Sequence, residues 1–121
     1  MSKLILLVDD EPDVLTAVSF RLRKNGYEVE IVDSGLQALE YLKNRRPDLI
    51  LLDVRMPGID GLETCRRIRS QEGGMNIPII LFTASVNVVQ EKGFQEARAN
   101  DFIAKPFDSQ ELLTKIQKLL S

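Results

Sequence analysis

The hydrophobic positions of this chain follow two patterns that alternate along its length. One is a short, uninterrupted apolar run, which is typical of a strand buried on both faces of a parallel sheet. Such runs occupy residues 4–8, 49–52, 79–82 and 102–104. Residues 28–32 instead alternate between polar and apolar types. This alternation predicts a half-exposed strand at an edge of the sheet.

Between these runs, apolar residues recur every three or four positions, which is the spacing of an amphipathic helix. Gly26 follows the first such stretch as a stop signal, and Ser34, Asp60 and Asp108 open later ones as caps. The five predicted stripes are Val14, Leu15, Val18 and Leu22; Leu36, Leu39 and Leu42; Leu62, Cys65 and Ile68; Val88, Val89, Phe94 and Ala97; and Leu112, Leu113, Ile116, Leu119 and Leu120.

Five strand–helix units in succession predict an α/β fold, in which helices cover both faces of a five-stranded parallel sheet. The 121 residues, 44% of them hydrophobic, suit one domain spanning 1–121. A net charge of −2 argues against direct binding to nucleic acid. The one basic cluster, Arg66, Arg67 and Arg69, is interpreted as a solvent-exposed helix face.

The residues that the chain lacks exclude several kinds of chemistry. It contains no histidine, which excludes Ser-His-Asp and Cys-His catalysis, histidine-based zinc sites and a phosphohistidine of its own. The single cysteine, Cys65, cannot form an internal disulfide, which predicts a reducing, cytoplasmic location. The first apolar run is too short for a signal peptide or a membrane span.

Polar residues follow each of the buried runs at the point where the strand is expected to end. They are Asp9 and Asp10 after residues 4–8, Asp53 after 49–52, Thr83 after 79–82 and Lys105 after 102–104. Open parallel sheets bind ligands beyond the carboxyl ends of their strands. We therefore expect three carboxylates, one hydroxyl and one ammonium to share this edge of the sheet.

Helix capping is a competing explanation, because Asp and Thr are also common at helix N-termini. One of Asp9 and Asp10 could serve only as a cap, since Pro12 suits the first turn of the next helix. Asp53 is less easily explained in this way because Asp60 already caps the following helix. Lys105 is not a capping residue at all.

Clustered carboxylates repel one another by about 4 kcal/mol per pair at ~4 Å and an effective dielectric of ~20, so they need a cation. An all-oxygen ligand set favours Mg²⁺, Mn²⁺ or Ca²⁺. A lysine and a threonine beside it would suit phosphate oxygens. The set predicts metal-assisted phosphoryl transfer to a carboxylate nucleophile. The chain contains neither of the glycine-rich phosphate-binding motifs, G-x-x-x-x-G-K-[ST] and G-x-G-x-x-G.

Four segments resemble those of the receiver domain of two-component response regulators, the fold of the chemotaxis regulator CheY. The resemblance covers nearly the whole chain, and its strength lies in the order and spacing of all four segments. They are Val8-Asp9-Asp10-Glu11-Pro12, Leu52-Asp53-Val54-Arg55-Met56-Pro57-Gly58-Ile59-Asp60-Gly61, Phe82-Thr83-Ala84 and Phe102-Ile103-Ala104-Lys105-Pro106-Phe107.

The resemblance implies a doubly wound, flavodoxin-like (βα)5 fold with strand order 2-1-3-4-5, and a role for each residue of the edge. Asp53 would accept the phosphoryl group, and Mg²⁺, with Mn²⁺ as a substitute, would be the metal. Its ligands would be Asp10 directly, Asp53, the backbone carbonyl of Arg55, and Asp9 through water. Thr83 and Lys105 would contact the phosphoryl oxygens, Phe102 would be an aromatic switch, and the Lys105–Pro106 bond would be cis.

The resemblance also implies partners. A sensor histidine kinase or a phosphotransfer protein would donate the phosphoryl group, and the domain would catalyse only its own phosphorylation and dephosphorylation. Its output face, formed by residues 86–97 and 102–120, would bind a downstream effector or a second copy of the chain, with no nucleic acid or membrane. One departure from the family's usual Ala-Gly-Ala-Asp is Ala97-Arg98-Ala99-Asn100, where Arg98 is expected to adopt a positive φ.

Two other interpretations remain. A Mg²⁺-dependent phosphohydrolase with an aspartate nucleophile usually carries a second aspartate two positions later, where this chain has Arg55. A receiver that acts only as a phosphorylation-independent binding module would be expected to lack one of the acidic residues or the lysine, and none is missing here.

Overall fold

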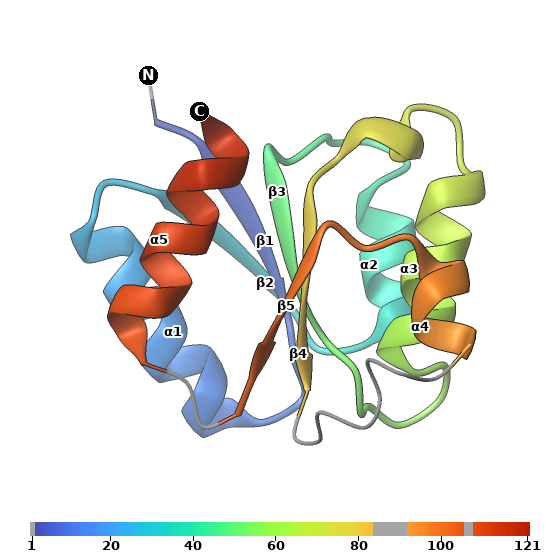
Figure 1. Cartoon of the computed structure of the whole chain (residues 1–121), viewed down its shortest axis with the longest axis horizontal. Coiled ribbons are helices and arrows are strands. Elements are labelled where there is room, and N and C mark those ends of the chain that lie inside the picture. Colours follow the sequence, from blue (N-terminus) through green and yellow to red (C-terminus); the bar gives the residue numbers. More distant parts are fainter. Residues whose placement is uncertain (1, 84–91, 106–107) are drawn as a thin grey trace.

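The computed structural model describes residues 2–83, 92–105 and 108–121 (Figure 1). All five strands are parallel, and they lie side by side in the order β2-β1-β3-β4-β5. The predicted fold class and strand order are therefore confirmed. The strands are β1 (Leu4–Val8), β2 (Glu28–Val32), β3 (Leu49–Asp53), β4 (Ile79–Thr83) and β5 (Asp101–Ala104).

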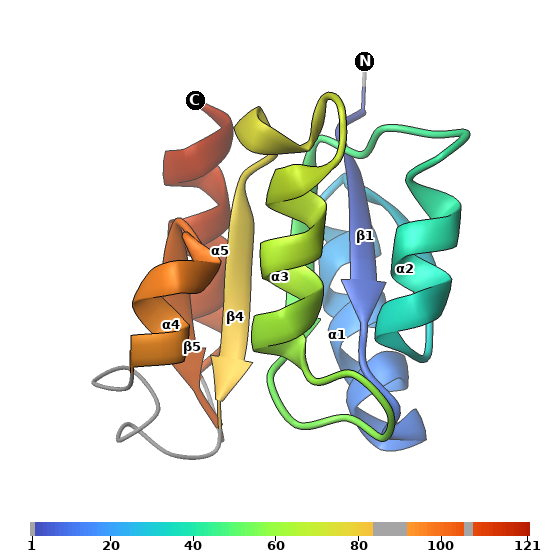
Figure 2. The same cartoon turned by 90° about the vertical axis from the view of Figure 1, so that its right-hand side faces the viewer.

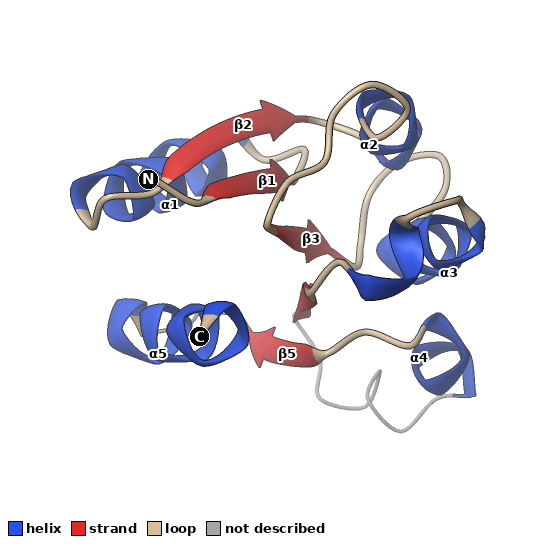
Figure 3. Cartoon of the chain, turned by 90° about the horizontal axis from the view of Figure 1, so that it is seen from above, coloured by secondary structure: helices blue, strands red, loops and turns tan. Residues whose placement is uncertain are grey.

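Helices cover both faces of this sheet. When the molecule is seen from above, α1 and α5 lie on one side of the strands and α2, α3 and α4 on the other (Figure 3). The helices are α1 (Pro12–Lys24), α2 (Gly35–Tyr41), α3 (Gly61–Ser70), α4 (Lys92–Ala97) and α5 (Ser109–Leu120), with a short 3₁₀ turn, η1 (Gly74–Asn76), after α3. Among the described residues, none of the helices is both long and apolar enough to cross a membrane.

The continuous apolar runs make sense because successive side chains of a strand point to opposite faces of the sheet. In β1, for example, Ile5 and Leu7 belong to the core beneath α1 and α5, whereas Leu6 and Val8 belong to the core beneath α2, α3 and α4. Each strand of the centre must therefore be apolar at every position. The strand β2 lies at an edge, as the alternating pattern predicts, with Glu28 exposed and Val29 buried. Ile31 is also exposed, although the alternation would place it on the buried face.

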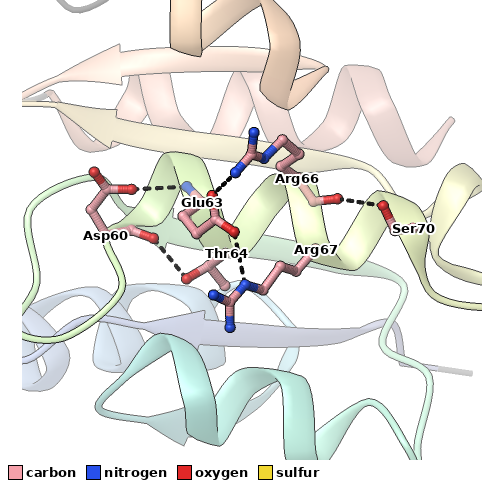
Figure 4. A network of polar contacts seen from close by, with 6 residues as sticks. All are labelled: Asp60, Glu63, Thr64, Arg66, Arg67 and Ser70. Atoms are coloured by element: carbon pink, nitrogen blue, oxygen red, sulfur yellow. Dashed lines mark hydrogen bonds and ion pairs between the residues drawn. The ribbon is translucent and has the colours of Figure 1, made fainter.

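Local capping signals start three of the helices. The Ser34 side chain accepts from the backbone N–H of Gln37, and Asp108 accepts from that of Gln110. At the start of α3, Asp60 accepts from the backbone N–H of Glu63 at 2.8 Å (Figure 4). Asp60 thus supplies the cap of α3, as predicted, and Asp53 is not needed for it.

Two predictions about helix faces are wrong. Leu36 is 60% exposed, because α2 turns Gly35, Ala38 and Leu39 toward the core instead. Gly35 packs so closely on α3 that a Cβ there would lie 2.1 Å from Oγ1 of Thr64, which fixes the rotation of α2. The other wrong prediction is that all three arginines of α3 form a solvent-exposed face. Arg69 is only 4% exposed, because its guanidinium donates to backbone carbonyls of the segments before β4 and after α4.

Further expectations concern the neighbourhood of α4. Ala97 is buried and Phe94 is partly buried, in agreement with the predicted stripe, whereas Val88 and Val89 lie outside the described residues. So does Pro106, and with it the expected cis bond. The positive φ expected at Arg98 is confirmed, with a value of 59°.

Candidate metal and phosphoryl site

The three predicted carboxylates come together at the carboxyl end of the sheet, where the strand arrowheads point the same way (Figure 2). One carboxylate oxygen each from Asp9, Asp10 and Asp53 lies within 4.8 Å of the others. Asp9 follows β1, and Asp53 is the last residue of the neighbouring strand β3. Asp9 and Asp53 are buried, whereas Asp10 is exposed to solvent.

Lys105 reaches this cluster from the far edge of the sheet. Its Nζ lies 3.1 Å from Oδ2 of Asp9 and 3.2 Å from Oδ1 of Asp53. A longer contact of 3.4 Å joins it to Oε1 of Glu11, a residue that the sequence analysis did not include in the site. The ammonium also lies 5.8 Å from the centre of the Phe82 ring. Only 16% of the Lys105 side chain is exposed, so this charge is committed to the cluster.

The capping alternative for Asp9 and Asp10 is answered by the local hydrogen bonds. The N-cap position of α1 is Glu11, which makes no side-chain capping bond, and Pro12 follows as the first helical residue. Asp9 uses Oδ1 to accept from the backbone N–H of Glu11 at 3.0 Å, and Oδ2 to face Lys105. Asp9 therefore shapes the turn before α1 while its charge remains in the cluster.

The electrostatics of the cluster are strongly unbalanced. Burial and, after it, the nearby Asp9 carboxylate raise the pKa of Asp53 to about 6, against the opposing influence of Lys105 and of a hydrogen bond with the Arg55 backbone. Burial lowers the pKa of Lys105, but the carboxylates of Asp53 and Asp9 outweigh this, so that the pKa is raised overall. One lysine does not neutralise three carboxylates.

This imbalance and the donor set fit a divalent cation that prefers oxygen. Mg²⁺ is commonly held by one or two carboxylates and keeps other positions for water or phosphate oxygens. Asp9, Asp10 and Asp53 could hold such an ion, and Lys105 would remain beside it as a second positive charge. Arg55 is exposed, so its side chain is not committed to the cluster.

The structure places Thr83 near the same edge and Phe102 farther from it. Thr83 ends β4 and is 1% exposed, and its carbonyl accepts from the backbone N–H of Lys105 at 2.8 Å. Phe102 pairs in register with Leu81, the middle residue of β4, two positions before Thr83. Its ring is half-buried and meets Phe94 edge-to-face, with ring centres 5.8 Å apart.

Gly61 also shapes the site, although the sequence analysis assigned it no role. A Cβ at Gly61 would lie 2.1 Å from the carbonyl oxygen of Asp53 and 2.7 Å from Cα of Val54. The Gly61 N–H donates to the Val54 carbonyl at 2.7 Å. This close return of the chain sets the backbone around Asp53. The sequence contains one signal of this role: Gly61 directly follows the helix cap Asp60, at a position where most side chains are tolerated, so a glycine there indicates a close backbone approach.

Comparison with known proteins gives one consistent result. A sequence model of the response regulator receiver domain matches residues 5–117. The response regulator MprA of Mycobacterium sp. (strain KMS) is 42% identical over 116 residues, which cover 96% of this chain and 50% of that protein. The chain thus spans about half the length of the curated relatives it matches.

Solved structures agree with the sequence matches. The receiver domain of the sensor histidine kinase PA1611 from Pseudomonas aeruginosa PAO1, with a magnesium ion coordinated in its active-site cleft, has a TM-score of 0.92 and 40% identity, covering 99% of this chain and 98% of that one. The response regulator TrrA from Thermotoga maritima, in complex with Mg²⁺-BeF, has a TM-score of 0.88 and 36% identity, covering 98% and 99%.

Proposed function

Because this chain belongs to the response regulator receiver family, a family of signalling modules rather than classical enzymes, we propose that it receives a phosphoryl group on Asp53 beside a bound Mg²⁺. The observation that carries this proposal is the meeting of Asp9, Asp10 and Asp53 within 4.8 Å, with Lys105 directed at two of them. Two structures similar to this chain carry magnesium.

The proposed metal ligands are Asp10, Asp53 and the backbone carbonyl of Arg55, with Asp9 acting through water. When bound, Mg²⁺ supplies positive charge for the carboxylates and for the oxygens of an incoming phosphoryl group. Asp53 is the nucleophile, and one of its carboxylate oxygens forms a bond to phosphorus. The bond between phosphorus and the donor's nitrogen or oxygen breaks, and its electron pair leaves with the donor. Lys105 and the Thr83 hydroxyl then donate to the phosphoryl oxygens.

The donor must be a separate molecule, because the chain has no histidine of its own. A phosphohistidine on a sensor histidine kinase or a phosphotransfer protein, or a small acyl phosphate, fits this chemistry. Hydrolysis of the acyl phosphate by the domain itself would reset the signal. The buried thiol of Cys65, which donates to the Ala97 carbonyl at 3.1 Å, supports a reducing, cytoplasmic location.

The proposed output is a rearrangement of α4, β5 and α5, which would bind a downstream effector or a second copy of the chain. Phosphorylation adds negative charge at the sheet edge, and Thr83 lies at that edge. Phe102 supports a role in this face because its ring is only half-buried, so an inward turn would remove more of its surface from water. The ring lies between Phe94 of α4 and the Lys115 ammonium of α5, which is 5.9 Å from the ring centre.

The proposal is tested by measuring intact mass after incubation with acetyl phosphate and Mg²⁺. The wild-type chain should gain one phosphoryl group, and Asp53→Asn should gain none. Asp33→Asn, which removes an exposed carboxylate just past β2, is the matched control and should behave as the wild type does. Equal gain by Asp53→Asn would refute the assignment, and no gain by the wild type would favour a phosphorylation-independent binding module.

A further inference from the structure

Arg69 differs from the two other arginines of α3 in its surroundings. Arg66 and Arg67 pair with Glu63 on the solvent side of the helix (Figure 4). Arg69 is 4% exposed and lies on the inner side, four residues after the buried Cys65. A guanidinium is costly to bury, and this cost is offset only where its N–H groups find acceptors. The partners of Arg69 therefore indicate what it does.

Four acceptors surround the Arg69 guanidinium, and they come from two segments, one before β4 and one after α4. Nε donates to the Arg98 carbonyl at 3.0 Å, just beyond α4. Nη1 donates to the carbonyls of Gly74 and Ile77, at 2.9 and 2.6 Å, in the connection before β4. Nη2 donates to Oδ1 of Asn100 at 2.8 Å. One side chain thus joins α3, the start of β4 and the end of α4.

Asn100 completes this arrangement through a second set of bonds. Its Oδ1 also accepts from the backbone N–H of Ile79, and its own N–H donates to the Ile79 carbonyl, both at 2.9 Å. Ile79 is the first residue of β4, and Thr83 at the phosphoryl site is the last. At about 3.3 Å per residue, the two ends lie about 13 Å apart, so these bonds hold the end of the sheet remote from the site.

The last residues of α4 are held by further contacts. Ala97 is completely buried, and its carbonyl accepts from the Cys65 thiol at 3.1 Å. Near the middle of the helix, by contrast, Phe94 is half-buried and meets Phe102 edge-to-face. Aromatic pairs tolerate several geometries, whereas the hydrogen bonds around the buried Arg69 guanidinium are all made in one arrangement.

We propose that Arg69 and Asn100 are positioning residues that clamp the segment 97–100, so that α4 tilts about its C-terminal end when the domain is activated. Movement of Phe102 then displaces Phe94 while Ala97 to Asn100 stay in place. This inference depends on the proposed function for the origin of the movement. The existence of the clamp does not depend on it, and the two are tested separately.

Amide hydrogen exchange of the metal-free full chain tests the clamp. Arg69→Lys keeps the charge but loses the planar fork, so the Ile79 and Asn100 amides should exchange about tenfold faster, beyond any change at Leu7 and Leu51 in the sheet centre. Arg67→Lys, on the exposed face of the same helix, is the matched control and should leave both amides unchanged. Unchanged exchange at both amides in Arg69→Lys overturns the clamp.

Two substitutions of Asn100 keep the test decisive if Arg69→Lys folds poorly. Asn100→Ala removes the shared acceptor and should accelerate exchange at Ile79 as Arg69→Lys does. Asn100→Asp retains the acceptor and adds a charge that Arg69 can pair with, so protection should be equal to or greater than that of the wild type. Equal loss of protection in Asn100→Asp and Asn100→Ala contradicts the proposed role of Oδ1.

Amide chemical shifts on addition of Mg²⁺ and beryllofluoride, which stands in for the phosphoryl group on Asp53, test the tilt. In the wild type, shifts should be large at Phe94 and Phe102 and small from Ala97 to Asn100. In Asn100→Ala they should spread into the segment 97–100. Equal shifts along all of 93–100 in the wild type overturn the tilt. If the chemical shifts of Asp9, Asp10 and Asp53 do not change, the result counts against the proposed function. The hydrogen-exchange experiment then still shows whether the clamp exists.

Discussion

Lys105 at the end of β5 and Asp53 at the end of β3 are joined across the intervening strand β4, with 3.2 Å between Nζ and Oδ1. The same ammonium lies 3.1 Å from Asp9. A single lysine thus balances part of the negative charge of the three carboxylates that the ends of β1 and β3 bring together. Most properties expected of the site follow from this incomplete balance.

Asp53→Asn should raise the free energy of unfolding of the metal-free protein at pH 8 by about 1–3 kcal/mol. The reason is that burial and Asp9 raise the pKa of Asp53 from its ordinary value of 3.8 to about 6, so the ionised form is less stable in the native state than in the unfolded chain. Urea denaturation in the presence of EDTA measures this difference.

The pH dependence of the same variant has a definite sign. The native state holds the Asp53 proton more tightly, so the stability from this group is complete below pH 3.8 and is lost as the pH rises through about 6. The advantage of Asp53→Asn should therefore shrink as the pH falls from 8 toward 4. Asp33→Asn should show no such trend. A variant less stable than the wild type at pH 8 contradicts the argument.

Lys105→Met should lower the stability of the metal-free protein by about 2–3 kcal/mol, because Asp9 and Asp53 are then buried without a cation. Mg²⁺ should restore part of the loss, since the ion neutralises the same carboxylates. Thermal unfolding with and without Mg²⁺ measures both effects. Lys118→Met, at an exposed position of α5, is the control. A loss that Mg²⁺ does not change would separate Lys105 from the proposed metal site.

Asp10→Ala should weaken Mg²⁺ binding by about tenfold or more, and the stabilisation that Mg²⁺ gives to the fold should fall accordingly. The exposed carboxylate of Asp10 lies within the same oxygen cluster as Asp9 and Asp53, at the side open to solvent. Calorimetric titration gives the affinity directly. Unchanged affinity in both Asp10→Ala and Asp9→Ala would leave the cluster without a metal-binding role.

Gly61→Ala should cost about 1–3 kcal/mol and reduce phosphorylation of Asp53, because the new Cβ would meet the Asp53 carbonyl and Val54 Cα, both of them backbone atoms. Gly93→Ala in α4 is the matched control: its Cβ would lie 3.6 Å from Cδ1 of Leu62 in α3, an ordinary van der Waals contact. That change should be neutral or stabilise by up to about 1 kcal/mol. Chemical denaturation gives the free energy of unfolding of both variants. Equal changes in the two variants would contradict the steric argument.

Arg98→Gly should stabilise the protein by about 0.5–1 kcal/mol, because Arg98 has a φ of 59° and glycine adopts that conformation without a steric cost. The Arg98 carbonyl, which accepts from Arg69, is retained in the variant. Arg98→Ala removes the side chain but keeps the strain, so it is the proper control. An Arg98→Gly protein that unfolds more easily than Arg98→Ala would show that the strain is negligible.

Hydrophobic spacing and local capping signals are enough to predict the strands, the order of the helices and the polar residues at the strand ends. Those features rest on local physics: a strand covered on both faces must be apolar throughout, and a cap such as Asp60 acts on its own helix. The same reasoning separated Asp53 from the capping role. The strand order 2-1-3-4-5 came from the resemblance to receiver domains, since periodicity does not specify which strands are neighbours.

Which side chains meet depends on the three-dimensional fold. Arg66, Arg67 and Arg69 are alike in sequence, yet Arg69 alone of the three is buried, since its acceptors come from the connections before β4 and after α4. Likewise, the exposure of Leu36 follows from the close approach of α2 to α3. The raised pKa of Asp53 depends on burial and on Asp9 from another strand. Burial and charge coupling depend on neighbours distant in the chain, which a local pattern does not identify.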